Sequence, residues 1–152
     1  MRTERGATLP TELVERIRNA ISERDLDALT SCFASDYLNE APVHPSRGFR
    51  GRTQVRKNWE RIIGGVPDIT ATVLRSVNDG GTAWSEWEMS GTRVDGSAFQ
   101  MCGVAIFGVA DGEAQWCRFY LDPVDEASTD IDRATASVVS GQPAQREGTN
   151  PA

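Results

Sequence analysis

The spacing of hydrophobic residues changes once along the chain, at Pro67. Before Pro67, apolar residues recur at intervals of three and four, which is the pattern of helices with one buried face. After Pro67, apolar and polar residues alternate, which is the pattern of strands. A chain with this order is expected to pack its helices on a sheet that is built mainly from one continuous segment.

The segment before Pro67 predicts three helices. The first runs from about Pro10 to Arg24, and its apolar stripe consists of Leu13, Val14, Ile17, Ala20 and Ile21. Asp25 is a residue type that caps helix N-termini, and a short second helix follows it. An extended piece at 37–39 and a loop rich in Pro and Gly at 40–52 come next. The third helix carries Val55, Trp59, Ile62 and Ile63, and the glycine pair at 64–65 ends it.

The segment after Pro67 predicts four strands, at 69–77, 82–92, 99–110 and 113–121. Short turns with Asp-Gly and Gly-Gly pairs join them, and such turns make antiparallel hairpins. We therefore predict an α+β fold in which three N-terminal helices pack on a curved, mainly antiparallel sheet of four to six strands.

The two ends of the chain differ from the middle. Residues 1–7 are expected to form a flexible N-terminus. Residues 125–152 contain no aromatic residue and are rich in Ser, Thr, Ala, Gly and Pro, so we expect a mostly disordered acidic tail. The span 131–139 can form one short helix within it.

Charge and residue counts exclude several classes of protein. The chain has 152 residues, which fits one domain, and a net charge of −6 without any basic run. Nucleic acid and anionic membranes are therefore poor partners. Three cysteines without a C-x-x-C pair and a single histidine favour a reduced, cytoplasmic protein with neither a disulfide framework nor a metal site.

Three strings of residues carry a resemblance to a known family. They are Phe33–Tyr37 leading into Gly51–Arg56, then Trp87–Thr92, then Gly103–Phe107 continuing through Asp111 to Asp122. In this order they resemble the SnoaL-like branch of the nuclear transport factor 2-like superfamily, over residues 8–124. The resemblance implies a cone-shaped half barrel with a deep pocket, often dimeric. It also implies isomerase, cyclase or epoxide hydrolase chemistry on a small hydrophobic molecule such as a steroid, polyketide, terpenoid or lipid, without a cofactor.

The match to the family's catalytic residues is incomplete. Tyr37 and Asn39 match a Tyr-x-Asn pair that positions a water in the epoxide hydrolases, and Glu88 falls where their acid lies. Phe119 falls where the family has an aspartate that acts as the catalytic base. Gly103 and Ala105 fall where other members carry polar groups. No single activity of the family can therefore be carried over to this chain.

The catalytic prediction rests on Glu86 and Glu88. On a strand their side chains point the same way as Trp84, and two carboxylates near an indole in a pocket would form a neutral acid with a charged partner. We predict Glu88 as the acid or base and Glu86 as its electrostatic partner. Tyr37 and Asn39 would orient the reacting oxygen. The alternatives are that the carboxylates face solvent while Trp87 faces the core, and that the Tyr-Asn pair only closes a local turn.

The predicted binding pocket is mainly apolar. Its expected residues are Trp84, Met101, Gly103, Phe119 and Leu121, with Trp59 in the interior and His44 at the mouth. Arg47, Arg50 and Arg52 lie near His44 in the sequence and would either bind an anion at the rim or be solvated. If the chain has no catalytic residues, it would be a hydrophobic-ligand-binding or dimerisation module instead.

The sheet face away from the helices is predicted to form a homodimer. In the register assigned from the sequence, this face carries Trp87, Met89, Cys102, Val104, Ile106, Trp116 and Tyr120. A patch this apolar is rarely left in water on a monomer. The alternative is the reverse register, in which these residues form the core.

Overall fold

A computed structural model describes residues 8–127 and 129–142. Its helices are α1 (Pro10–Glu23), α2 (Leu26–Ser31), α3 (Arg52–Gly65) and α4 (Ile131–Ser140). Its strands are β1 (Phe33–Glu40), β2 (Phe49–Arg50), β3 (Thr70–Asp79), β4 (Thr82–Thr92), β5 (Ala98–Ala110) and β6 (Glu113–Pro123). A short 3₁₀ turn, η1 (Pro45–Arg47), precedes β2.

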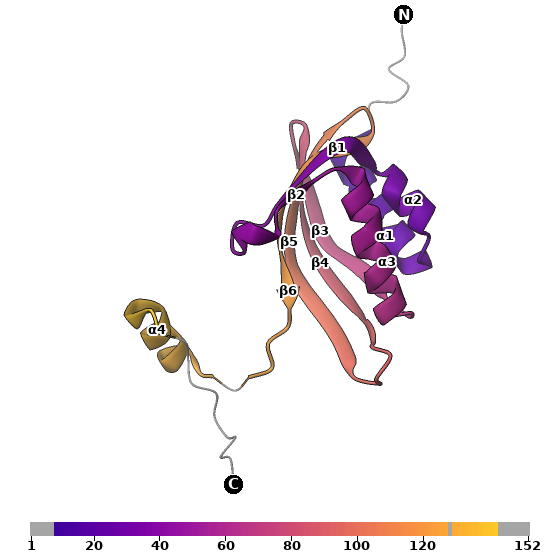
Figure 1. Cartoon of the computed structure of the whole chain (residues 1–152). Helices are drawn as coiled ribbons and strands as arrows, with labels where there is room; N and C mark the ends of the chain where they lie inside the picture. The colour runs from indigo at the N-terminus through magenta and orange to yellow at the C-terminus, as the bar shows by residue number, and fades with distance from the viewer. Residues whose placement is uncertain (1–7, 128, 143–152) are drawn as a thin grey trace, which may run out of the picture.

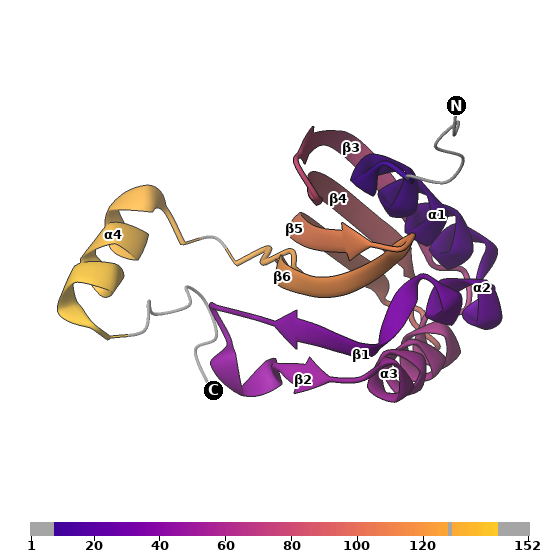
Figure 2. The same cartoon turned by 90° about the horizontal axis from the view of Figure 1, so that it is seen from above.

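The strands form one sheet in the order β2-β1-β6-β5-β4-β3. Strands β3 to β6 make the predicted antiparallel meander, whereas β1 joins the edge of β6 in parallel. The sheet curves, so that β1 and β2 stand opposite the meander and the three N-terminal helices cover the end between them (Figures 1 and 2). The α+β prediction, with a curved and mainly antiparallel sheet, is confirmed.

The helices are held on the sheet by the stripes that the sequence predicts. Every apolar residue of the predicted stripe of α1 is buried. The Asp25 carboxylate accepts a hydrogen bond from the Ala28 backbone N–H at 3.0 Å, as its N-cap position requires. The Ser22 hydroxyl bridges α1 to β3, since it exchanges hydrogen bonds with the backbone of Ala71. These contacts fix one side of a core that lies between α1 and the concave face of the sheet.

The register of β4 differs from the sequence prediction. Trp87 lies opposite Gly103 and faces the core, where it is 1% exposed, while Trp84 lies on the outer face and is 48% exposed. Glu86 is opposite Val104 on that same outer face, and its carboxylate pairs with Arg75 at 2.9 Å. The predicted inward orientation of the glutamates and the predicted outward orientation of Trp87 and Met89 are both wrong.

Helix α4 lies away from the sheet in both views (Figures 1 and 2). The Asp130 side chain caps it by accepting from the Arg133 N–H at 2.9 Å. The helix falls within the predicted tail, whereas positions 1–7, 128 and 143–152 lie outside the described residues. Among the described residues, no helix combines the length and the apolar character needed to cross a bilayer.

Candidate functional site

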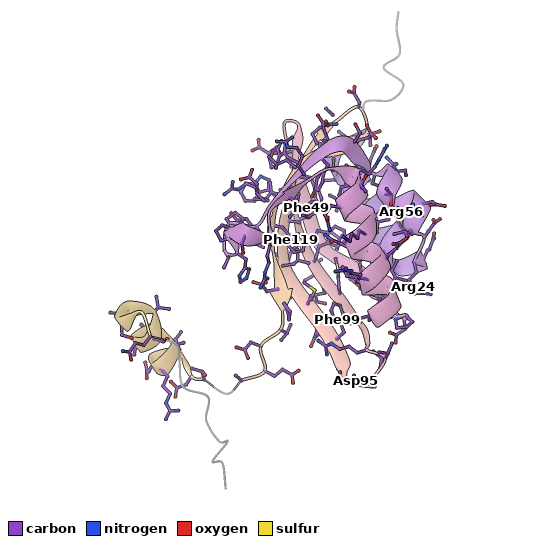
Figure 3. The ribbon with its side chains drawn as sticks, in the orientation of Figure 1. Arg24, Phe49, Arg56, Asp95, Phe99 and Phe119 are labelled. Atoms are coloured by element: carbon purple, nitrogen blue, oxygen red, sulfur yellow. The ribbon has the colours of Figure 1, made fainter. Side chains whose placement is uncertain are left out.

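A cavity of about 450 Å³ lies between the concave sheet face, α1 and α3. Its wall is predominantly apolar, and strands β1, β5 and β6 supply much of it. Phe49 on β2 and Phe119 on β6, both labelled in Figure 3, line it. Apart from Tyr120, whose hydroxyl contacts Arg118, the polar and charged residues of the wall are Tyr37, Asn39, His44, Arg47, Asn58, Arg61 and Asp122. A volume of this size suits a small organic molecule.

Tyr37 and Asn39 form the polar part of the β1 wall. The Tyr37 hydroxyl donates a hydrogen bond to Asn39 Oδ1 at 2.8 Å, which is possible because alternate residues of a strand share a face. In this orientation of the amide, its oxygen faces the hydroxyl and its NH2 group is turned away from it. The Asn39 Nδ2 group makes no side-chain hydrogen bond within the described part of the chain, so it remains a donor for a ligand oxygen.

The tyrosine is held in its neutral, donating form. Burial raises the pKa of Tyr37 well above its usual value, and the neighbouring Cys117 raises it further. Burial also raises the pKa of Cys117 to about 12, so its thiol is protonated at neutral pH. Neither group is an anion or a nucleophile at neutral pH, and both serve as neutral wall of the cavity.

His44 and Asp122 meet at the cavity wall from opposite ends of the domain sequence. His44 Nε2 lies 3.2 Å from Asp122 Oδ2, and the other carboxylate oxygen lies 3.6 Å from Arg47 Nη1. The histidine precedes η1, and the aspartate lies near the end of β6. When Nε2–H donates to the carboxylate, the Nδ1 lone pair is left free to accept a proton. In that tautomer the carboxylate orients the imidazole ring.

Most of the residues predicted for the site line the cavity: Tyr37, Asn39, His44, Trp59, Met101, Phe119 and Leu121. Trp84, Glu86 and Glu88 do not, because the register of β4 turns them to the opposite sheet face. The carboxylates therefore cannot act on a molecule in the cavity. Of the three arginines predicted at the rim, Arg47 lines the cavity, whereas Arg50 and Arg52 bond elsewhere.

Gly103 also has a role different from the one predicted. It is absent from the cavity wall, and its φ of +150° lies in a region that side chains rarely adopt. A Cβ at this position would collide with the backbone of Tyr120 on β6. The glycine therefore permits the close approach of β5 and β6 instead of leaving room for a ligand. Ala105 does lie on the wall, two residues further along β5.

Sequence reasoning missed three polar groups of the wall. Asn58, Arg61 and Asp122 line the cavity but are not among the residues predicted for the site. Asn58 lies on the wall and accepts a hydrogen bond from Gln54 Nε2 at 2.7 Å. The available signal was helical spacing, because Asn58 and Arg61 follow Val55 at intervals of three. Among the described residues, no group of three His, Cys, Asp or Glu side chains is placed to hold a metal ion.

The raised thiol pKa values predict slow alkylation of two cysteines. Burial raises the pKa of Cys32 as well as that of Cys117, and both side chains are buried, whereas Cys102 is exposed. At pH 8, with a pKa of about 12, the thiolate fraction of Cys117 is about one in ten thousand. Iodoacetamide followed by mass spectrometry should modify at most one thiol in the folded protein. It should modify all three in urea. Rapid native labelling of Cys117 would contradict the burial described here.

Comparison with known proteins supports the same architecture. The sequence profile of the SnoaL-like domain matches residues 14–118. The structure resembles IdmH of Streptomyces antibioticus, a proposed polyketide cyclase, with a TM-score of 0.65 and 22% identity over 74% of this chain and 91% of that one. It resembles TsrD of Streptomyces laurentii with a TM-score of 0.64 and 24% identity over 74% of this chain and 87% of that one.

A proposed ketosteroid isomerase of Kribbella flavida is similar with a TM-score of 0.60 and 20% identity, over 78% of this chain and 81% of that one. These identities are low, so the likenesses concern the fold. None of the curated proteins compared with the chain matches it. Because the profile covers well over half of the chain and the fold agrees with it, the chain belongs to the SnoaL-like domain family.

Proposed function

We propose that the chain is a cofactor-free acid/base enzyme that acts on a small hydrophobic carbonyl compound, as an isomerase or a cyclase. The observation that carries the proposal is the His44–Asp122 pair on the wall of an otherwise apolar cavity. Epoxide hydrolysis has less support, because Glu88, which falls where the acid of those enzymes lies, is outside the cavity.

The proposed chemistry uses three side chains of the wall. His44 Nδ1 takes a proton from the carbon next to the carbonyl, and Asp122 stabilises the imidazolium that forms. The electron pair of the broken C–H bond moves to the carbonyl oxygen, where the Asn39 amide donates a hydrogen bond to the enolate. Return of the proton at another carbon completes an isomerisation. Attack of the enolate carbon on a second carbonyl of the same molecule, with protonation of its oxygen by His44, completes a cyclisation.

Deuterium exchange tests this proposal without knowledge of the natural substrate. The wild-type protein in D₂O should accelerate exchange of the α-protons of a bicyclic ketone such as 2-tetralone. Proton NMR measures this exchange as the loss of the α-proton signal. The variant Glu88→Gln should behave like the wild type, because Glu88 lies on the outer face of the sheet. Binding of such ketones with no exchange above the buffer rate would contradict an enzymatic function.

A second candidate function is ligand binding without chemistry. It is favoured by the apolar part of the wall, which includes Trp87, Phe107, Phe119 and Leu121. The same exchange measurement separates the two functions, since a binding protein would hold the ketone and leave its protons in place.

We also propose that the chain forms a homodimer through the outer face of the sheet. Trp84 lies opposite Ile106 there, and Tyr120 lies opposite Val104. Trp116 extends the patch, with its indole over Gly108. Trp and Tyr are enriched at protein interfaces, and two copies of one face pair readily about a two-fold axis.

The variant Val104→Glu should convert this dimer into a folded monomer. The new carboxylate would lie opposite Glu86 in the middle of the face. Each copy would then carry two neighbouring carboxylates into the interface, where they are removed from water. Light scattering at tens of micromolar should report half the wild-type mass with an unchanged circular dichroism spectrum. Val43→Glu, at an exposed position beside the cavity, should leave the mass unchanged. A wild-type protein with the mass of one chain would contradict the dimer.

A further inference from the structure

The cavity wall has a charge opposite to that of the whole chain. The chain carries a net charge of −6. In contrast, the residues that line the cavity include two arginines, Arg47 and Arg61, and a single carboxylate, Asp122, among the described residues. Arginine therefore outnumbers carboxylate on the wall by one. Acid/base chemistry on a neutral ketone uses Asp122 and His44 and leaves both arginines without a role.

Arg61 differs from the other arginines of its helix. Arg52 pairs with Glu113 at 3.9 Å, and Arg56, which is labelled in Figure 3, pairs with Asp27 at 2.8 Å. Within residues 8–127 and 129–142, Arg61 makes neither an ion pair nor a side-chain hydrogen bond. It belongs to the helix face that lines the cavity, since Asn58 and Ile62 on either side of it do so as well.

Arg47 provides a second cation on the same wall. Its Nη1 lies 3.6 Å from Asp122 Oδ1, and the arginine side chain is 63% exposed. An ion pair this long and this exposed holds the guanidinium weakly. Asp122 keeps its closer contact with His44, at 3.2 Å, when Arg47 turns toward a ligand. Both arginines can thus offer donors to an anion without disturbing the histidine–aspartate pair.

We propose that the ligand of this cavity is an amphipathic carboxylate, whose apolar body fills the cavity and whose carboxylate is bound by Arg61, with Arg47 as the second cation. The planar guanidinium matches a carboxylate with two parallel hydrogen bonds. This inference rests on the proposed function in that the carboxylate is the substrate of the His44 reaction, and it assigns the class of that substrate. The binding step itself requires no catalysis.

Isothermal titration with matched probes tests the proposal. 2-Naphthylacetate and its uncharged amide share one apolar body and differ in charge. The carboxylate should bind about tenfold or more tightly than the amide, as charge-assisted hydrogen bonds require. Arg61→Gln should remove most of this preference and leave the affinity for the amide unchanged. Arg56→Gln, on the same helix but paired with Asp27, should behave like the wild type.

Equal binding of the two probes would overturn the proposal, and so would an equal weakening of both by Arg61→Gln or the failure of both to bind. 2-Naphthyl phosphate is a third probe, and its binding more tightly than the carboxylate would assign the site to phosphate monoesters instead. These outcomes are independent of the deuterium exchange of 2-tetralone. Failure of the anion preference is therefore distinguishable from failure of the proposed acid/base function.

Discussion

Replacing His44 by Gln is expected to lower the rate of α-proton exchange by about 10²–10⁴-fold, which is the usual contribution of a general base. Gln keeps a polar group of similar length but cannot accept a proton at neutral pH. His44 is part exposed, and its only side-chain partner in the described part of the chain is Asp122, so the variant should fold normally. The exchange rate measured by proton NMR, with circular dichroism as a check on folding, gives the result.

Asp122→Asn is the companion variant, because Asp122 acts through the histidine. It should lower kcat while leaving KM for a neutral ketone near the wild-type value, since the proposed role of the carboxylate is exerted through the imidazole that it orients. Glu88→Gln is the matched control, because the resemblance implies an acid at this position and the structure places it on the outer face. An exchange rate within a few-fold of the wild type for His44→Gln would exclude His44 as the base.

The local elements of the fold could be predicted from the sequence because short-range rules determine them. The strand at 82–92 has the predicted bounds, and Asp25 caps α2 as expected. The Asp-Gly pairs at 95–96 and 111–112 lie at the predicted turns. Each of these depends on residues within a few positions of one another, so periodicity and turn chemistry are sufficient.

The face of β4 could not be assigned from alternation alone, because both faces of the strand carry a tryptophan. The informative difference was charge. The set with Trp84 includes Glu86 and Glu88, whereas the set with Trp87 includes Ser85, which hydrogen-bonds the Trp87 indole at 2.8 Å. Burying two carboxylates costs far more than burying one hydroxyl with partners, so the uncharged set belongs in the core. The family resemblance pointed to the other face and misled the prediction.

The His44–Asp122 pair could not be predicted because it depends on a long-range pairing. The two residues are 78 positions apart in the chain. They meet because β1 runs parallel to β6, with Glu40 opposite Arg118, and this places the loop after β1 beside the end of β6. Hydrophobic periodicity predicts strands but not which strand neighbours which. A lone histidine in a loop and an aspartate at a strand end therefore carried no signal of contact.

Trp87→Ala is expected to destabilise the protein by about 3–5 kcal/mol, the usual cost of truncating a buried aromatic side chain. Trp87 is 1% exposed and packs in the main hydrophobic core, and its indole N–H donates to Ser85 Oγ. The loss of stability has two parts, the favourable free energy of transferring the indole out of water and the cost of the cavity that it leaves. The cavity remains because a close-packed core relaxes only in part. Urea unfolding followed by circular dichroism measures the change.

Trp84→Ala removes the same side chain three residues away on the same strand, from the outer face. It should cost less than half as much, since Trp84 is 48% exposed. Any stability that Trp84 contributes through the proposed dimer should depend on protein concentration, whereas the loss at Trp87 should not. Equal, concentration-independent losses at the two positions would contradict the register of β4. The register matters for the proposed chemistry as well, because it excludes Glu86 and Glu88 from the cavity, whose wall includes His44 and Asp122.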